Sequence, residues 1–490
     1  MKRVIIIFGV LCFSISFSDA QNVDPKKAYE EFRKKAIGDY DDFRQQANRK
    51  YADFLAEAWK SFRAMPMIAK PKEKPVPPVK YDHKQVELLK NKSLPCDTVI
   101  APAVIPEQPK PVAPIPEVVQ PDENKKSFTF YGVLCSVSYP SDDHLILPDI
   151  EQKSLSRVWK TLSDSKYNPL INDCLKARDK MNLCDWAYLQ FLDKVAKACV
   201  GNDDNTAVLL KDFLFCQSGY QTRLGVCDGH LVMLVATGNG IVIYDHKYFN
   251  IDGIHFYPLD CNADNMNICV AEFPGEKGLS LIVGDEQHFA SEITQERVLS
   301  SERYQNVSAQ VQTNKELIDF YNTYPQSQSG GDFGTRWQYY ADTPLSETAQ
   351  AGLYPALKSA INGMNQSDAD NIILNFVQTS LVYKYDEEVW GYDRPFFPDE
   401  TLYYPYCDCE DRAILFSRIV RDIMHLQVIL VYYPNHLASA VNFTEEVNGD
   451  YLLVNGKKYV VCDPTFIGAP VGRTMTGMDN ATAKAILLNF

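Results

Sequence analysis

The stretch "YPYCDCEDRAILFSRIV", residues 404–420, places two cysteines one residue apart in an acidic patch where a helix is expected to begin. After the second cysteine, apolar residues recur every three or four positions, which predicts an amphipathic helix over residues 411–424. Thiols at the head of such a helix raise the question of their chemistry.

Four strand-like runs follow this helix. They are "QVILVYY" (427–433), "HLASAVNF" (436–443), "YLLV" (451–454) and "KYVVC" (458–462). Turn residues separate them, among which Asn455-Gly456 is a strong hairpin signal. One helix that leads into an antiparallel sheet predicts an α+β domain over residues 331–490.

Three side chains in this region carry candidate chemistry. Cys409 comes just before the predicted helix, His436 opens the second strand, and Asp463 follows the last one. A thiol is mostly protonated at neutral pH, and a helix N-terminus with an adjacent imidazole activates it. We therefore expect Cys409 to attack an acyl carbonyl, His436 to transfer the proton, and Asp463 to orient the imidazole.

The order of "CEDRA" (409–413), His436 and "DPT" (463–465) resembles the transglutaminase-like cysteine hydrolases of the papain-like superfamily, of the exported bacterial type. The segments "NIILNFVQTSLVYKYD" and "PFFPDETL" also look like the part that precedes the nucleophile, so the resemblance covers about residues 367–475. It implies a cysteine-bearing helix on a small antiparallel barrel and acyl-enzyme chemistry. Bacterial members mostly hydrolyse amides rather than crosslink them.

The chain departs from this family at Cys407, where a glycine usually precedes the nucleophile by two residues. Cys407 is a possible redox or disulfide partner. Asp408 and Glu410 flank the nucleophile as in calcium-responsive periplasmic members, which implies a candidate calcium site; no other cofactor is expected. Gln378, in the preceding helix, is the candidate side chain for an oxyanion hole.

Other interpretations of the cysteines stay open. Cys409 could be a structural thiol or half of a disulfide. The set Cys407, Cys409, His436 and Cys462 has the ligand types of a zinc site, although its spacing fits no familiar zinc motif.

The N-terminus reads as a signal peptide over residues 1–20. Lys2 and Arg3 precede an apolar run, and small residues stand before Gln21, so we expect an exported protein, periplasmic or secreted to the cell envelope. Leu11 is bulky where a lipoprotein signal at Cys12 needs a small residue. No later stretch reaches the roughly 18 apolar residues of a membrane span.

Residues 21–65 predict an amphipathic helix with an eleven-residue period, seen in Tyr29, Tyr40 and Tyr51. This helix either packs on its own protein or serves self-association or docking on an envelope partner through residues 24–62. Proline-dense segments then predict a semi-rigid linker over residues 66–126, a spacer without helix or central strand.

Residues 127–330 contain a possible second copy of the same fold with additional β structure. Ala207 precedes His230 by the same 23 residues that separate Ala413 from His436, and "HLVMLVA" (230–236) reads as a strand. In this alignment Asp203 replaces the nucleophile and Asp245 stands for Asp463. An aspartate cannot supply the thiol, so the copy is expected to be catalytically silent, a pseudoenzyme domain.

The sequence thus favours an exported cysteine peptidase or amidase acting on a protein or a peptidoglycan peptide. A non-catalytic envelope binding or scaffold protein built on the same folds is the alternative, and transglutamination is a weaker third. The formal net charge of −14 disfavours a nucleic-acid partner, which would require a basic face.

Overall fold

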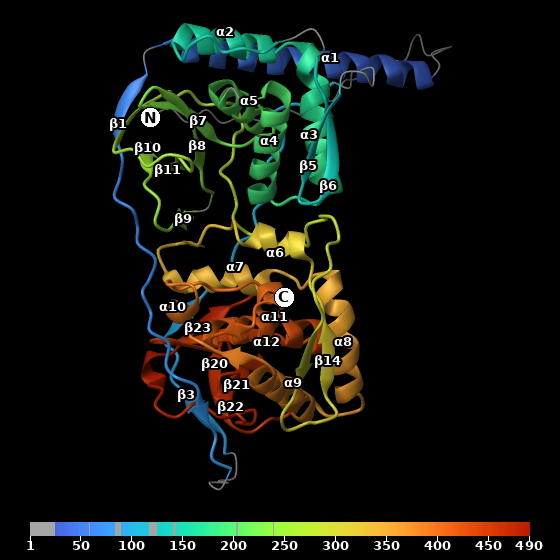
Figure 1. The fold of residues 1–490 in the computed structure, drawn as a ribbon, viewed down its shortest axis with the longest axis vertical. Helices are drawn as coiled ribbons and strands as arrows, with labels where there is room; N and C mark the ends of the chain where they lie inside the picture. Colours follow the sequence, from blue (N-terminus) through green and yellow to red (C-terminus); the bar gives the residue numbers. More distant parts are fainter. Residues whose placement is uncertain are drawn as a thin grey trace, which may run out of the picture.

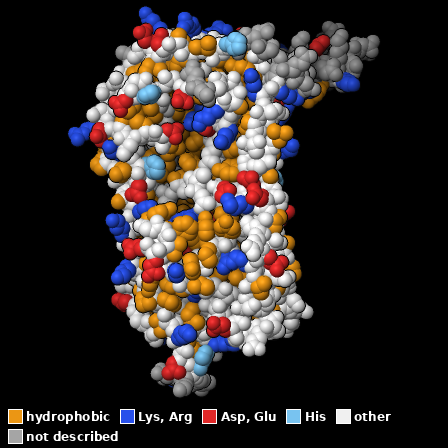
Figure 2. Space-filling view, in the orientation of Figure 1, with side chains coloured by type: hydrophobic (Ala, Val, Ile, Leu, Met, Phe, Trp, Pro, Cys, Tyr) orange, Lys and Arg blue, Asp and Glu red, His pale blue; other side chains and the backbone are white. Residues whose placement is uncertain are grey.

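The protein consists of two stacked lobes (Figure 1), which a computed structural model describes over residues 25–57, 59–83, 90–116, 125–140, 144–201, 204–238 and 240–490. The N-lobe contains α1 to α5 and a six-stranded sheet, and the C-lobe contains α7 to α12 and a seven-stranded sheet. On the face drawn in Figure 2, the surface is hollowed where the lobes meet, and hydrophobic side chains gather around the hollow. The predicted signal peptide, Cys12 and Asp203 lie outside the described residues.

The N-lobe sheet is antiparallel and carries helices that bury its apolar face. Its strands, in spatial order, are β1 (Lys60–Arg63), β12 (Asn265–Ile268), β7 (Thr222–Cys227), β8 (His230–Ala236), β11 (Ile254–Tyr257) and β10 (Phe249–Ile251). Its helices are α1 (Pro25–Leu55), α2 (Gln152–Leu162), α3 (Asn168–Lys180), α4 (Asp185–Val200) and α5 (Asp204–Gln217). A hairpin of β5 (Lys125–Phe130) and β6 (Val133–Ser138) packs beside α4 and α3.

The C-lobe sheet is antiparallel except for its two outermost strands. In spatial order its strands are β3 (Lys92–Leu94), β20 (Asp450–Val454), β21 (Lys457–Cys462), β19 (His436–Asn442), β18 (Gln427–Tyr433), β23 (Lys484–Leu487) and β4 (Thr98–Ile100). The principal helices are α8 (Glu347–Ile361), α9 (Gln366–Ser380) and α12 (Cys409–Met424), while α6 (Lys315–Tyr321) and α7 (Arg336–Asp342) lie at the junction. The predicted α+β class is confirmed.

Both lobes use the same connections between one helix and five strands. In the N-lobe, α5 leads into β7, β8, β10, β11 and β12, and the strands lie in the order β12-β7-β8-β11-β10. In the C-lobe, α12 leads into β18, β19, β20 and β21, and with β23 the order is β23-β18-β19-β21-β20. All of these pairings are antiparallel, so the two sheets share the same strand order and strand directions.

The proline-rich region behaves differently from the predicted spacer. Instead of separating two bodies, it descends along both lobes and adds short strands to sheet edges (Figure 1). Strand β2 (Val79–Lys80) pairs with β22 (Phe466–Ile467), and β3 and β4 become the outer strands of the C-lobe sheet. Proline lacks an N–H donor but is compatible with extended chain at the edge of a sheet. A proline-rich segment therefore cannot form a central strand, but it can still pair with the outer strand of a sheet.

Helix α1 is divided between a packed half and an exposed half. Tyr51 is 2% exposed and Ala52 is fully buried, whereas Tyr40 and Tyr29 are 50% and 65% exposed. The packed half also makes buried polar contacts with the N-lobe, including Asn48 with Gln217. The interpretation of a helix that packs on its own protein therefore holds for the second half of the predicted stripe.

None of the helices within the described part of the chain is both long enough and apolar enough to cross a bilayer. The longest of them, α1, has 31 residues, but lysine, arginine, aspartate and glutamate recur along its whole length. Its exposed aromatic side chains therefore belong to a strongly charged helix.

Candidate functional site

Cys409 is the first residue of α12, two residues earlier than the predicted start of the helix. Asp408 caps the helix, since its carboxylate accepts the N–H of Glu410 at 3.1 Å. The Asp411 carboxylate in turn accepts the N–H of Asp408 at 3.0 Å, which completes a capping box. This local network starts the helix and fixes the cysteine at its N-terminus, where the thiol is only 4% exposed.

His436 and Asp463 meet as the sequence predicts. His436 opens β19, Asp463 follows the end of β21, and these two strands are neighbours in the sheet. Nε2 of His436 lies 2.9 Å from Oδ2 of Asp463. The other carboxylate oxygen accepts the backbone N–H groups of Thr465 and Phe466, so the carboxylate is held from both sides.

The thiol lies next to this pair. A hydrogen bond from the backbone N–H of Leu437, the residue after His436, reaches the Cys409 sulfur. Nδ1 of His436 is buried and has no hydrogen-bond partner among the described residues. With Nε2 engaged by Asp463, Nδ1 is the ring nitrogen that remains able to accept a proton.

The electrostatic surroundings oppose ionisation of the thiol. Burial raises the pKa of Cys409 well above its ordinary value, and the carboxylates of Asp408 and Glu410 raise it further. Only the hydrogen bond from the Leu437 N–H acts in the other direction. The resting form is therefore a neutral thiol, and its activation requires a base such as His436.

An acidic cluster surrounds the start of α12. Asp386, Asp393 and Glu410 form one group of converging carboxylates, and Asp408, Glu410 and Asp411 form a second, with ligand atoms within 4.8 Å of one another in each group. Burial and the nearby Glu410 raise the pKa of Asp386 to about 8.

One cation of the protein partly neutralises this cluster. Arg336 on α7 forms ion pairs with Asp393 and with Glu410, the latter at 3.3 Å, and Trp337 donates to Glu410. However, Oδ2 of Asp408 and Oε1 of Glu410 are buried without a hydrogen-bond partner in the described structure. Since buried carboxylate oxygens normally have partners, these two fit the oxygen ligands of a hard cation such as calcium.

Gln378 has a different position from the one predicted for an oxyanion donor. Its amide nitrogen donates to the backbone carbonyls of Asp463, Phe466 and Ala469 at 2.8–3.1 Å, and its oxygen accepts the N–H of Gly468. These bonds use its donors and fix the loop that follows Asp463. Gln378 is therefore a residue that positions the loop, and no free N–H remains for a substrate oxygen.

Cys407 is a buried free thiol. It lies in β17 (Tyr406–Cys407), which pairs with β16 (Val382–Tyr383), and its sulfur is 3.8 Å from the carbonyl oxygen of Val382. All twelve cysteines of the described chain are unbridged, so the structure contains no disulfide at Cys407.

The four residues of the zinc alternative do not converge into a group able to hold a metal ion in the described part of the chain. The thiol of Cys462 donates to Asp370 at 3.1 Å. Among the described residues, both groups able to hold a metal ion consist of carboxylates alone. The spacing of the cysteines, which matches no zinc motif, agrees with this result.

Among its described residues, the N-lobe has no equivalent triad. Asn205, near the start of α5, accepts the backbone N–H of Leu231 at 2.9 Å, so an amide oxygen takes the place that the thiol occupies beside Leu437 in the C-lobe. His230 opens β8 but is exposed.

The predicted equivalence of Asp245 with Asp463 is wrong. Asp245 follows β9 (Val242–Ile243), and its N–H donates to the carbonyl of Ile68. The strand that corresponds to β21 is β11, which ends at Tyr257. The sequence spacing gave the wrong equivalence because β9 lies between β8 and β10, whereas β19 is followed directly by β20 in the C-lobe.

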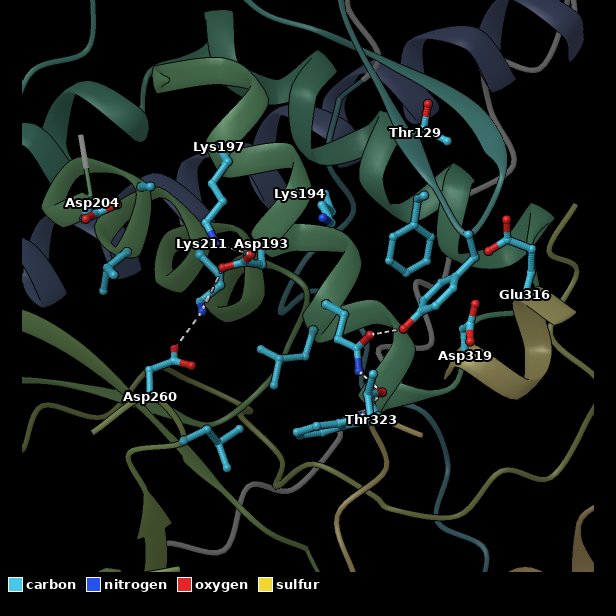
Figure 3. Close-up of a pocket in the computed structure, with 18 of the residues that line it drawn as sticks. Thr129, Asp193, Lys194, Lys197, Asp204, Lys211, Asp260, Glu316, Asp319 and Thr323 are labelled. Carbon is cyan, nitrogen blue, oxygen red and sulfur yellow. Dashed lines mark hydrogen bonds and ion pairs between the residues drawn. The ribbon is translucent and has the colours of Figure 1, made fainter. Parts of the chain in front are cut away.

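The N-lobe also contains a cavity of about 790 Å³ between α4, α5 and the β5–β6 hairpin (Figure 3). Lys211 on α5 projects into it and forms ion pairs with Asp193 at 3.3 Å and Asp260 at 3.5 Å. Lys197 pairs with the same Asp193. These ion pairs neutralise only part of the charge on its wall, which also carries Lys194, Asp204, Glu316 and Asp319. The cavity lies in the lobe that does not contain Cys409, His436 and Asp463.

The sequence alone did not single out two members of the acidic cluster, Asp386 and Asp393. Both lie in "YDEEVWGYDRP" (385–395), an acid-rich segment well before Cys409. An acidic loop is usually a solvated one, so only the fold, which buries Asp386 against the helix start, distinguishes them.

No known protein-family model matches the chain, and no curated protein matches it at a significant level. The functional interpretation therefore depends on the residues and their geometry.

Proposed function

We propose that the protein is an exported cysteine hydrolase, of the transglutaminase-like class, that cleaves amide or peptide bonds through Cys409, His436 and Asp463. The observation that carries this proposal is the arrangement of the imidazole. Its Nε2 is 2.9 Å from the Asp463 carboxylate, its buried Nδ1 has no hydrogen-bond partner among the described residues, and the backbone N–H of the next residue, Leu437, reaches the Cys409 thiol at a helix N-terminus. A purely structural histidine in a core would have both nitrogens satisfied.

In the proposed reaction, the Cys409 sulfur attacks the carbonyl carbon of the scissile amide while its proton passes to Nδ1 of His436. The tetrahedral intermediate collapses, the C–N bond breaks, and His436 returns the proton to the leaving amine. Water then attacks the thioester with His436 as base, which releases the acid and restores the thiol. Asp463 keeps the ring oriented and stabilises the imidazolium. The backbone N–H of Leu437, already beside the sulfur, is a candidate donor to the oxyanion.

The substrate class that fits an exported hydrolase is a protein or a peptidoglycan peptide of the envelope. Transfer of the acyl group to an amine instead of water would give transglutamination by the same intermediate, and no second amine-binding feature favours it. The N-lobe, in which Asp203 aligns with Cys409, serves as a silent copy that shapes the molecule or binds a partner.

The test uses peptide cleavage by the full mature chain, with a library of quenched fluorescent peptides as probes. Cys409→Ser should abolish turnover, and Cys407→Ser, which alters a thiol two residues away in a neighbouring strand, should retain it. A peptide vinyl sulfone should form an adduct at Cys409 that mass spectrometry locates. Equal cleavage by both variants would overturn the proposal.

The raised pKa of Cys409 specifically favours the rival, a non-catalytic scaffold. A scaffold would bind peptides without turnover, and its binding would survive Cys409→Ser. The same library, read by fluorescence anisotropy as well as by cleavage, separates the two functions.

We also propose that the acidic cluster binds calcium, on the strength of the buried and unpartnered oxygens of Asp408 and Glu410. A ligand that binds only the folded protein stabilises it by about 2.7 kcal/mol at a hundredfold excess over its dissociation constant. We therefore expect calcium to raise the melting temperature and EDTA to reverse the change. Asp386→Asn should weaken this response, whereas the exposed acid Asp479 offers a control substitution. An unchanged melting temperature in calcium would exclude the site.

A further inference from the structure

Residues 73–81, "EKPVPPVKY", form an extended segment, here called the strap, that runs across the C-lobe beside the triad. Its first anchor is the hairpin that ends at His436. The hydroxyl of Tyr432 donates to Glu73 at 2.6 Å. The N–H of Val76 donates to the backbone carbonyl of Asn435 at 2.9 Å, and the N–H of Lys74 donates to the Asn435 side chain at 3.2 Å. The strap therefore begins directly over the residue that precedes the catalytic histidine.

The second anchor lies on the side of the nucleophile. The hydroxyl of Tyr383 donates to the carbonyl of Val76 at 3.5 Å. Tyr383 lies in β16 directly opposite Cys407 in β17, and Cys407 precedes the nucleophile by two residues. One residue of the strap is thus held between the histidine hairpin and a neighbour of the cysteine.

The third anchor lies beyond Asp463. Strand β2 pairs in parallel with β22, so that Val79 is opposite Phe466, and the N–H of Tyr81 continues the pairing to the carbonyl of Ile467 at 2.9 Å. Val76, Val79 and Tyr81 pack against the apolar cluster of Phe466, Ala469 and Met475. Main-chain pairing with side chains in apolar contact is the mode by which extended peptides bind at a sheet edge.

The three anchors flank the three members of the triad, and the triad is closed off. Cys409, His436 and Asp463 are 4%, 1% and 2% exposed. A peptide substrate needs access to the sulfur, so this conformation is a resting one. We infer that the strap is an autoinhibitory segment that occupies the peptide groove of the hydrolase, and that the substrate is an extended polypeptide that takes its place parallel to β22.

Proline suits this role. Pro75, Pro77 and Pro78 offer no N–H to the groove and restrict the residues before them to extended conformations. A segment of this kind loses little conformational entropy on docking and pairs only at the positions between its prolines. The inference rests on the proposed function, because a groove for substrate presupposes a substrate.

The test measures how fast iodoacetamide alkylates Cys409 in the full mature chain, read by mass spectrometry of the peptide that contains it. Val76→Arg puts a charge into the apolar cluster and should release the strap. We expect alkylation of Cys409 to become at least about tenfold faster, because the reagent reaches a buried thiol only after the cover opens. Val104→Arg is the matched control, since Val104 belongs to the same proline-rich region but is 73% exposed.

Two further measurements make the outcome decisive. Buried Cys174 and Cys462 report unfolding, and their alkylation should stay slow in Val76→Arg. A synthetic peptide of residues 71–82 should restore protection of Cys409 when added to this variant. Unchanged alkylation of Cys409, or no protection by the peptide, would overturn the inference. If alkylation of Cys409 becomes faster in Val76→Arg and the added peptide slows it again, the strap covers the thiol. If the same variant cleaves no peptide, the proposed hydrolase activity is contradicted while the covering role of the strap is supported.

Discussion

The two lobes share a topology but differ in the side chains near the helix start and around the histidine. Each has a helix that leads into an antiparallel sheet with the same strand order, and each opens its second strand with a histidine. In the C-lobe the histidine is buried and held by Asp463, whereas in the N-lobe His230 is exposed and Asn205 occupies the helix start. The comparison teaches that the scaffold alone does not specify chemistry; a few residues at the helix start and at one strand end do.

Removing each histidine in turn should give the largest difference between the two lobes. His436→Ala should lower kcat/KM for peptide cleavage by about 10²–10⁴-fold, the usual contribution of a general base. His230→Ala should leave cleavage unchanged because the exposed ring lies in the silent lobe. Comparable losses in both variants would mean that the N-lobe takes part in the reaction.

A second prediction concerns α1, which packs on the N-lobe and has no counterpart in the C-lobe. Tyr51→Ala should lower the free energy of unfolding of the N-lobe by about 3–5 kcal/mol, as for other buried aromatic truncations. Tyr40→Ala, in the same eleven-residue stripe but 50% exposed, should change it by about 0.5 kcal/mol or less. Urea unfolding followed by circular dichroism measures both, and similar losses would show that the exposed half of the stripe is also packed in solution.

A third prediction concerns the free cysteines, because an exported protein enters an oxidising compartment where neighbouring thiols form disulfides. In the N-lobe, burial and the neighbouring thiol of Cys261 raise the pKa of Cys227, and both cysteines are partly exposed. In an oxidising compartment these two should form a disulfide, detected as the loss of two hydrogens and a linked peptide in mass spectrometry. The loop that it closes predicts a stabilisation of about 4 kcal/mol, absent in Cys227→Ser. Two free thiols in protein isolated from the cell envelope would contradict this pairing.

The smallest effect concerns a buried acid in the C-lobe. Burial raises the pKa of Asp370 to about 7, against a hydrogen bond from Cys462 that lowers it. The folded protein therefore keeps this proton to higher pH than the unfolded chain does, so stability falls as pH rises from about 4 to 7 and stays reduced above that.

Asp370→Asn removes this titration without changing the size of the side chain. It should stabilise the protein by about 1–3 kcal/mol at pH 8, because one unit of pKa corresponds to about 1.4 kcal/mol. At pH 4 the gain should vanish. Asp212, buried in the N-lobe with its pKa raised to about 7, gives the corresponding test there. A stabilisation that does not depend on pH would show that repacking, and not titration, is the cause.

Local patterns of sequence predicted the elements well. The strands at residues 230–236 and 427–433 have the bounds that alternation and turn signals indicate, and the meeting of His436 with Asp463 followed from neighbouring strands. Features that depend on distant segments were not predictable in this way. Nothing in the proline pattern near Val79 indicates that it pairs with Phe466, and nothing near Gln378 indicates that a loop beyond Asp463 uses up its amide.

The docking of β2, β3 and β4 on the C-lobe sets an order of events during synthesis. Asn91, just before β3, contacts Lys458, which follows it by 367 residues. At about 5–20 residues per second, a ribosome needs roughly 20–70 seconds to produce the partner of a segment that emerged early. Until then the proline-rich region has no sheet to join, and its prolines disfavour helix formation. The nascent chain therefore completes its C-terminal sheet only at the end of translation, by recruiting strands that left the ribosome near the beginning.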